Sequence, residues 1–566
     1  MTFYKDFILK EMPIEKLRVN ESFCTLAWTG LSVSPTGMVT PCCLFESPIT
    51  DDDKITRIHE DDINTFYNGD FMSGVRKKMF SGEKVKGCRQ CYENEAHGGY
   101  SMRMRANHER YEILEQYDLE TPVVPVSLDL KLNNKCNLKC RMCQPQDSNL
   151  IYNEFSKILK KDKNFSNFSN TRLKDFELNV DLKEIAAWED SEEFFDKFKS
   201  MLPSLKKISL VGGEPLILNI VYRLLDYAIE TGDSKHIYIA ITTNMMVVPE
   251  EKLGRYFESF ESVLVNMSID AVGTELNYIR YPSSYEKIID NFKKLYTLAG
   301  KRRNIFFNFS MTIQAYNALY IVDILEEVEK LKIEGYEFRN CPFNFTYLYF
   351  PEHLSLRMLP GNIRERAIKK LVDYLERDNY ANKFKRLKND VQQLINYLKN
   401  DHLKNSLQLQ REFLYYTETL DKERNQTFKT SLTELYQGFT EAGVVASIPV
   451  ASYHKIREQG WELAKKGHLR RAIAKFKQSA ELSEDKYLDY REMAWMMLSI
   501  RKVNDAYHAY QKAYSLNSED KHIIRGLVIT SFKKGDEQLA SSLIDKSLHF
   551  FPEDKNLEDI KLKLFR

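Results

Sequence analysis

The sequence has no excess of either charge. Its 82 Lys and Arg residues balance 81 Asp and Glu residues, for a net charge of +1, so no basic field favours nucleic acid or an acidic membrane as a partner. The first residues lack the charged start, apolar run and cleavage site of a signal peptide. No apolar run reaches the roughly 18 residues that span a bilayer. We expect a cytoplasmic protein that binds neither nucleic acid nor membrane.

Cysteine is almost absent from the second part of the chain, since only Cys341 follows residue 143. The other eight are Cys24, Cys42, Cys43, Cys88, Cys91, Cys136, Cys140 and Cys143. A disulfide framework is not expected in a reducing compartment, and cysteines used as small apolar side chains would be scattered. Clustering at short spacings therefore indicates metal or iron–sulfur ligation, whereas Cys341 is expected to be an inert buried thiol.

The chain of 566 residues is too long for one core, and its pattern changes three times. Residues 1–110 hold the early cysteines and a helix expected at 66–80. Residues 120–350 alternate apolar strands with amphipathic helices, interrupted by a polar and acidic insertion at 150–200, and residues 360–446 are charged and helical. We expect strands at 123–132, 207–211, 237–242, 263–269, 305–312 and 343–349, and helices such as 220–229, 285–298 and 321–331. This alternation favours a parallel α/β sheet, open or barrel-like.

Residues 451–566 repeat with a period of 34 residues. The recurring positions are Ala472, Ala506 and Ala540; Phe476, Tyr510 and Ile544; and Leu482, Leu516 and Phe550. A helical period of this length, with small and large apolar positions in register, resembles tetratricopeptide repeats. Such repeats stack helical hairpins into an array whose concave face suits extended peptides. We expect this region to recruit a peptide or protein partner.

Three thiols follow the first expected strand within eight residues, as Cys136-x-x-x-Cys140-x-x-Cys143. Zinc sites usually pair their cysteines and need a fourth ligand. Three thiolates in one loop suit a 4Fe–4S cluster whose fourth iron stays open. This spacing resembles the signature of the radical S-adenosylmethionine (SAM) superfamily, which implies a partial (β/α)6 barrel and SAM as cofactor.

Polar groups at the ends of the later strands strengthen the resemblance. Gly212-Gly213-Glu214-Pro215 looks like the GGEP motif of the superfamily, in which glycines let the backbone approach a ligand closely. The resemblance implies that Glu214 or a nearby carbonyl holds the ammonium of SAM, and that Arg280 pairs with its carboxylate. The full set of expected SAM-contact residues is Gly212, Gly213, Glu214, Pro215, Asn244, Ser268, Asp270, Arg280 and Met142. Met142 stands where the family often has an aromatic residue, and its sulfur can still pack on the adenine ring.

The early cysteines resemble the twitch domain, a shortened SPASM module that binds one auxiliary 4Fe–4S cluster. Cys24, Cys42, Cys88 and Cys91 match its four ligand positions, and Cys43 is spare, either buried or an alternative ligand. Here the module precedes the barrel, whereas in most of the family it follows. A structural zinc site with four cysteine ligands is the alternative. The stretch from Glu95 to Arg105 leads into the barrel, and its basic residues face either the cluster or substrate cavity or, in a linker, the solvent.

The resemblance implies an enzyme that cleaves SAM reductively to a 5′-deoxyadenosyl radical and takes a hydrogen atom from its substrate. An auxiliary cluster with four cysteine ligands favours oxidative modification of a peptide or protein side chain. An electron donor such as flavodoxin or ferredoxin is expected. The alternatives are dehydrogenation of a small carbohydrate or alcohol, and a non-catalytic tetratricopeptide adaptor with a structural metal site.

Overall fold

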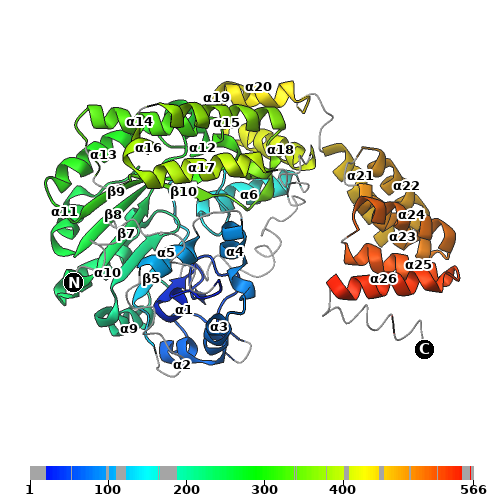
Figure 1. Ribbon diagram of the computed structural model, residues 1–566, viewed down its shortest axis with the longest axis horizontal. Helices are drawn as coiled ribbons and strands as arrows, with labels where there is room; N and C mark the ends of the chain where they lie inside the picture. The colour runs from blue at the N-terminus through cyan, green and yellow to red at the C-terminus, as the bar shows by residue number, and fades with distance from the viewer. Residues whose placement is uncertain are drawn as a thin grey trace. The chain divides into compact units, whose positions relative to one another are not determined.

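The computed structural model describes residues 21–51, 54–96, 101–109, 123–162, 165, 188–336, 338, 341–377, 379–400, 407–444, 451–482, 486–518, 520–550 and 561. Most of the insertion expected at 150–200 lies outside these residues. The chain divides into two compact units (Figure 1). One contains the described residues within 1–161, 170–404 and 425–438, and the other contains those within 162–169, 405–424 and 439–566.

The first unit is built on an open eight-stranded sheet in the order β10-β9-β8-β7-β6-β5-β1-β2. Six of these strands are those expected from the sequence: β5 (Ser127–Lys131), β6 (Lys207–Val211), β7 (Tyr238–Thr243), β8 (Ser262–Ser268), β9 (Ile305–Ile313) and β10 (Phe343–Tyr347). Each pairs parallel with its neighbour in this series. The partial (β/α)6 architecture is therefore confirmed, and the carboxyl ends of its strands meet at one edge.

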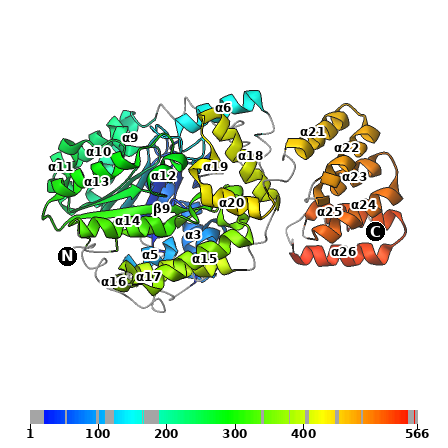
Figure 2. The same ribbon diagram turned by 90° about the horizontal axis from the view of Figure 1, so that it is seen from above.

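The two faces of the sheet differ in polarity. In β5 the fully buried Leu128 and Leu130 alternate with half-buried residues such as Asp129, and β6 follows the same pattern. One face is covered by α10 (Asn219–Glu230), α11 (Glu250–Ser259), α13 (Tyr285–Ala299) and α14 (Ile321–Ile333), as Figures 1 and 2 show. The opposite face presents polar side chains, among them Asn266, whose Oδ1 accepts from Asn308 Nδ2 at 3.2 Å.

Two short strands that the sequence did not reveal extend this sheet. β1 (Gly30–Val33) pairs parallel with β5, with Ser32 opposite Asp129, and β2 (Val39–Thr40) pairs antiparallel with β1. A separate hairpin joins β3 (Thr50–Asp51) to β4 (Lys54–Ile55). The cysteine-rich module is therefore fastened to the barrel sheet by main-chain hydrogen bonds.

The N-terminal module is also more helical than expected. It contains α1 (Leu26–Thr29), α2 (Ile63–Asn68), α3 (Asp70–Phe80), α4 (Arg89–Ala96) and α5 (Met102–Glu109). The single helix expected at 66–80 is wrong, because Gly69 adopts an extended conformation between α2 and α3. The Asp62 side chain starts α2 by accepting from the Thr65 amide.

Further helices follow the sheet and the cluster loop. They are α6 (Asn149–Lys161), α9 (Glu192–Met201), α12 (Gly273–Ile279), α15 (Gly361–Glu376), α16 (Tyr380–Lys383), α17 (Lys385–Lys399), α18 (Leu407–Arg424), α19 (Phe428–Ser431) and α20 (Thr433–Glu441). None of the described helices is long and apolar enough to cross a bilayer.

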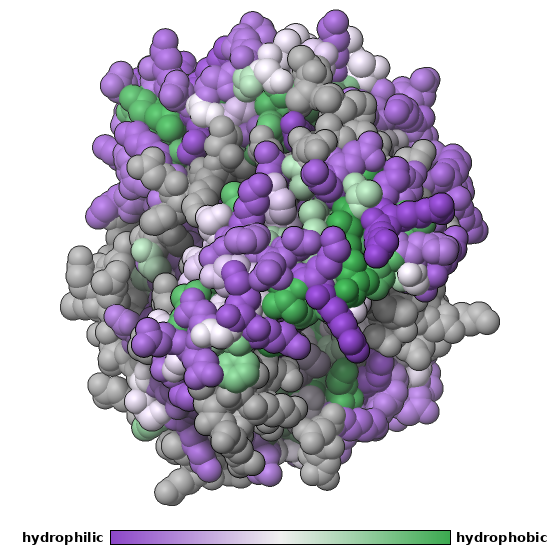
Figure 3. Space-filling view, turned by 90° about the vertical axis from the view of Figure 1, so that its right-hand side faces the viewer, coloured by the Kyte–Doolittle hydropathy of each residue, from purple (hydrophilic) through white to green (hydrophobic). Residues whose placement is uncertain are grey.

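The C-terminal region consists of helices that each pack on the next along the chain. They are α21 (Ala451–Lys465), α22 (Leu469–Leu482), α23 (Lys486–Ser499), α24 (Val503–Leu516), α25 (Lys521–Lys533) and α26 (Glu537–Phe550). The repeated alanines Ala472, Ala506 and Ala540 are all fully buried. The repeated leucine position is not a core position throughout, since Leu516 is 53% exposed at the end of α24. On the face drawn in Figure 3, hydrophilic side chains predominate and apolar ones form small patches.

Candidate functional site

The loop with the three closely spaced cysteines follows β5 at the carboxyl edge of the sheet. The Cys136 amide donates to Asn149 Oδ1 at 3.1 Å, and the Leu138 amide lies 3.4 Å from Cys136 Sγ. The Cys143 amide donates to the Cys140 carbonyl at 3.1 Å. These tight turns fold the three thiols back toward one another, with Cys140 buried and the other two half-buried.

The environment of these thiols fits a shared four-iron cluster. Burial raises the pKa of Cys136 to about 12, and the nearby Cys140 adds to the rise. A hydrogen bond to Cys140 raises the pKa of Cys143, and burial adds to it. Thiols deprotonate when they ligate metal, and three thiolates in such mutual reach can bind three irons of one cluster.

The cysteine loop is fastened to the segment that ends at Arg280. The Arg141 amide donates to the Ile279 carbonyl at 2.8 Å, and its Nε donates to the Tyr278 carbonyl at 3.1 Å. Its guanidinium carbon lies 3.6 Å from the centroid of the Tyr278 ring. Sequence reasoning missed Arg141, because its partner lies 137 positions away. The neighbouring Met142 is 8% exposed.

Gly212 and Gly213 follow β6 and lie against the same loop. The Glu214 amide donates to the Lys135 carbonyl at 2.9 Å. A Cβ on Gly213 would lie 2.2 Å from that oxygen, and the two glycines have φ values of +80° and +53°. Any side chain would therefore push the two loops apart. The two glycines are therefore required by the close contact between the two loops, and not only by the turn after β6.

The Glu214 carboxyl is fully buried beside the cysteine loop. Its Oε2 accepts from the Asn244 amide at 2.7 Å and its Oε1 from the Leu216 amide at 3.2 Å. Burial raises the pKa of Glu214 to about 7, although these donors offset part of the rise. A cation bound next to this carboxyl would favour its ionised form.

Asn244 links the end of β7 to the cysteine loop. Its Nδ2 donates to Asn137 Oδ1 at 2.7 Å and lies 4.0 Å from Cys136 Sγ. Its Oδ1 accepts from the Met246 amide at 3.0 Å. The structure thus brings Asn244 and Glu214 to the cysteines, as the order of strand ends predicted, and adds Asn137, which the sequence had not marked.

Ser268 ends β8, and a buried ion pair follows it. Arg280 Nε lies 2.7 Å from Asp270 Oδ2, with the two side chains 10% and 0% exposed. Asp270 Oδ1 accepts from the Thr312 amide at 2.7 Å. Arg280 Nη1 lies 3.9 Å from Cys140 Sγ, so the guanidinium bridges the β8 end and the cysteine loop. Asp270 therefore orients Arg280, a role that sequence reasoning had not assigned to it.

Three of the four expected ligands of the N-terminal module share one small apolar core, in which Cys24 is buried with Cys42 and Cys88 packed against it, and Cys91 lies close enough to affect the pKa of Cys24 and Cys42. Burial raises the pKa of Cys24 to about 12, and Cys91 and Cys88 add to the rise. The pKa of Cys42 is raised by burial, with contributions from Cys43, Cys24 and Cys91. Four thiols in mutual reach can complete a second iron–sulfur cluster.

Arg103 from α5 faces these thiols and lowers the pKa of Cys24 against the effect of burial. It is 2% exposed, and its Nε donates to Glu95 Oε1 at 2.9 Å. Its Nη1 donates to the Phe23 carbonyl at 2.9 Å. One residue of the basic stretch before the barrel therefore lies at the cysteine group rather than in solvent.

Cys43 lies in different surroundings from the other early cysteines. It is exposed, whereas Cys24 and Cys91 are buried. Although Cys43 reaches solvent, desolvation of its thiol by the protein around it raises the pKa of Cys43 to about 12, and the Asp129 carboxyl adds to this while Lys131 lowers it. Asp129 and Lys131 are half-buried residues of β5. Cys43 thus lies beside Asp129 and Lys131 on the polar side of the sheet, and it is also close enough to Cys42 to raise the pKa of that thiol. Cys341 is buried, as expected.

No group of three or more His, Cys, Asp or Glu side chains within the described ranges is spaced like the ligands of a single metal ion. The ligands of a four-iron cluster each bind a different iron.

Two family models match this chain. Residues 130–328 match the radical SAM superfamily, and residues 24–92 match the SPASM iron–sulfur cluster-binding domain. An uncharacterized protein of Methanocaldococcus jannaschii, MJ0907, is 28% identical over 232 residues, which cover 40% of this chain and 65% of the relative. This chain thus spans slightly less than two thirds of that relative.

Two solved structures are similar to part of the chain. Native anSMEcpe with bound AdoMet is 15% identical, with a TM-score of 0.29, over 44% of this chain and 59% of that one. Streptococcus suis SuiB bound to S-adenosylmethionine is 14% identical, with a TM-score of 0.25, over 58% of this chain and 53% of that one. At these TM-scores the likeness carries no information about function.

Proposed function

We propose that this chain oxidatively modifies a side chain of a peptide or protein. It has a radical SAM domain at residues 130–328 and a SPASM iron–sulfur domain at residues 24–92. The cofactors are a 4Fe–4S cluster, SAM and auxiliary iron–sulfur. The observation that carries the radical chemistry is the contact of the cysteine loop with Glu214, Asn244 and Arg280 at one edge of the sheet. The Glu214 carboxylate, which suits the ammonium of SAM, and the Arg280 guanidinium, which suits its carboxylate, both lie beside the three thiols.

The protein residues bind and orient the cofactors. Cys136, Cys140 and Cys143 would hold three irons and leave the fourth open to SAM. Bound there, the cluster and SAM supply a 5′-deoxyadenosyl radical that takes a hydrogen atom from the substrate. Glu214 receives the ammonium of SAM, and Arg280, held by Asp270, binds the carboxylate.

The other expected SAM contacts lie on the same edge. Ser268 ends β8, Asn244 directly follows the neighbouring β7, and both are assigned to the ribose. Met142 is assigned to the adenine, where sulfur packs on an aromatic ring. Gly212, Gly213 and Pro215 hold Glu214 in place, since the glycines admit the close contact with Lys135.

The N-terminal module supports the oxidative outcome. Cys24, Cys42, Cys88 and Cys91 supply four thiolates, which fill the ligand positions of an auxiliary cluster and leave no iron for the substrate. Its place beside the sheet through β1 and β5 suits it to take an electron from a substrate radical. We assign 1–110 to this module, 120–350 to the barrel, 360–446 to a helical region and 451–566 to tetratricopeptide-like repeats.

SAM cleavage tests the radical chemistry. Anaerobically reconstituted protein with dithionite and SAM should form 5′-deoxyadenosine, measured by chromatography. Replacing Cys136, Cys140 and Cys143 together with Ala should abolish it, because no cluster is held there. Cys341→Ala is the matched control, since this thiol is buried and the charged groups that act on it, Arg386 and Asp390, belong to neither cysteine group. Fully loaded protein that forms no 5′-deoxyadenosine would contradict the proposal.

Isotope transfer tests the substrate class without knowing the substrate. The enzyme is incubated with SAM and a protein fraction from cells grown on deuterated amino acids, or with a deuterated small-metabolite fraction. Deuterium should appear in 5′-deoxyadenosine with the protein fraction, because hydrogen abstraction moves the label to the nucleoside. Transfer from the metabolite fraction alone would favour a small carbohydrate or alcohol instead.

A further inference from the structure

The three helical hairpins of residues 451–550 turn through the same backbone motif. The residues at the turn are Gly467, Arg501 and Gly535, each 34 positions apart, with φ values of +78°, +63° and +84°. Their amides donate to Ala464, Leu498 and Phe532 at 2.9, 3.0 and 2.9 Å. A left-handed residue at the end of a helix is usually glycine, because a Cβ is strained there.

Arg501 is the exception among these turns. The neighbouring repeats form the same turn with glycine. Arginine at this position therefore adds backbone strain and contributes no stability to the turn itself. A residue kept in a strained conformation points to a use for its side chain. The Arg501 side chain is exposed, as is that of Lys502.

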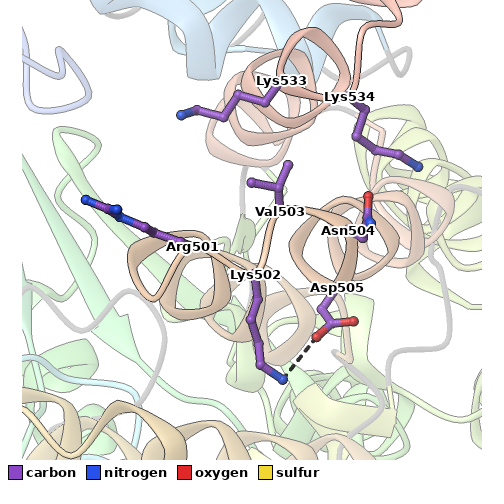
Figure 4. Close-up of a pocket in the computed structure, with 7 residues that line it drawn as sticks. All are labelled: Arg501, Lys502, Val503, Asn504, Asp505, Lys533 and Lys534. Atoms are coloured by element: carbon purple, nitrogen blue, oxygen red, sulfur yellow. Dashed lines mark ion pairs between the residues drawn. The ribbon is translucent and has the colours of Figure 1, made fainter.

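Arg501 lies on the rim of a pocket of about 430 Å³ between two turns. Arg501 and Lys502 come from the turn before α24, Val503, Asn504 and Asp505 from the first turn of α24, and Lys533 and Lys534 from the end of α25 (Figure 4). The lining thus holds four cationic side chains, which Figure 4 shows spread around the opening, and one carboxylate, Asp505, which lies 3.2 Å from Lys502 Nζ. Lys534 Nζ lies 4.0 Å from the centroid of the Tyr507 ring, a cation–π contact that holds the ammonium.

The pocket has a net positive charge and a neutral amide, Asn504, at its wall. Carboxylate side chains of an extended peptide match both, with ion pairs to the cations and a hydrogen bond from the amide. A nucleic acid fits less well, because no aromatic ring lines the pocket for base stacking. The whole chain also carries a net charge of only +1.

We propose that this pocket binds an acidic segment of a peptide or protein partner. This proposal rests on the proposed function in one respect: the partner is taken to be the peptide or protein that the enzyme modifies. The site lies on the turn edge of the repeats, not on the concave face where peptide binding was expected. Binding there would raise the local concentration of a tethered substrate.

The test measures binding of a labelled dodecapeptide of alternating Glu and Gly to the full chain by fluorescence anisotropy. Arg501→Gly should weaken binding about two- to fivefold, as expected for one exposed ion pair, while its melting temperature stays equal or rises because strain is removed. Adding Lys533→Ala and Lys534→Ala should weaken it roughly tenfold or more. Lys477→Ala, at an exposed position of α22, is the matched control and should change nothing.

Binding should also fall as salt is raised, since exposed charges are screened. A Gln–Gly peptide should not bind. Equal affinity of the Arg501→Gly variant, no binding by the unaltered chain at low salt, or tighter binding of a twelve-nucleotide single strand would each overturn the site. Peptide binding without SAM cleavage would instead leave this site standing and overturn the proposed function.

Discussion

Replacing Asp270 with Asn removes the charge that holds Arg280 in place. The ion pair joins Arg280 Nε and Asp270 Oδ2 at 2.7 Å, and both side chains are buried. The substitution keeps the shape, and the new amide oxygen can still accept from the Thr312 amide. It therefore changes the charge at Asp270 while leaving the rest of the site in place.

The expected loss of stability follows from leaving a buried guanidinium without its partner. Removing one member of a buried ion pair costs about 3–5 kcal/mol, so Asp270→Asn should destabilise the cluster-free protein by about 3 kcal/mol. Arg280→Met should cost less. Burial already raises the pKa of Asp270 despite Arg280, so the carboxyl can take up a proton when the guanidinium is gone. The double variant should regain most of the loss, because no buried charge remains.

Urea unfolding of the apoprotein measures these differences, and equilibrium dialysis measures SAM affinity in the reconstituted protein. Arg280→Met and the double variant should bind SAM about tenfold to a hundredfold more weakly, since a charged hydrogen bond is worth about 1.5–3 kcal/mol. Arg255→Met is the matched control, because its ion pair to Asp226 is largely exposed. Wild-type stability of Asp270→Asn would refute the buried-pair reasoning, and unchanged SAM affinity of Arg280→Met would refute the placement of Arg280.

Three further predictions concern the cysteines and one buried histidine. Reconstituted protein should hold about eight irons, and replacement of Cys136, Cys140 and Cys143 should leave about four; zinc in the N-terminal module with four irons overall would contradict the auxiliary cluster. Cys43→Ala should keep all eight, because Cys24, Cys42, Cys88 and Cys91 already supply four thiolates and Cys43 lies beside Asp129 and Lys131; a loss of about four irons would make Cys43 a ligand. Burial lowers the pKa of His353 to about 3, so the unfolded chain binds more protons below about pH 6.5. Stability should then fall as the pH drops from about 6.5, by up to about 1.4 kcal/mol per unit, and a similar pH dependence in His353→Leu would contradict this.

Much of the barrel could be predicted because its signals are local. Strands such as Lys207–Val211 are short apolar runs, and parallel strands carry their carboxyl ends to one edge. The order of motifs along the chain therefore predicted that Glu214, Asn244 and Arg280 would meet the cysteines. The prediction of one helix at 66–80 was wrong at Gly69, because the extended backbone of this residue separates two helices although the apolar pattern continues.

The sequence by itself determined which residues could carry the chemistry, because cysteine spacing and glycine positions depend on neighbours only a few residues away. The tertiary structure decided how they are supported. In the folded chain β1 pairs with β5, Cys43 lies beside Asp129, Asp270 forms an ion pair with Arg280, and Arg141 donates a hydrogen bond to the Tyr278 carbonyl. These contacts join residues far apart in the chain, and each depends on many weak packing and hydrogen-bond terms acting together. No local pattern encodes such a sum, so only the folded chain shows it.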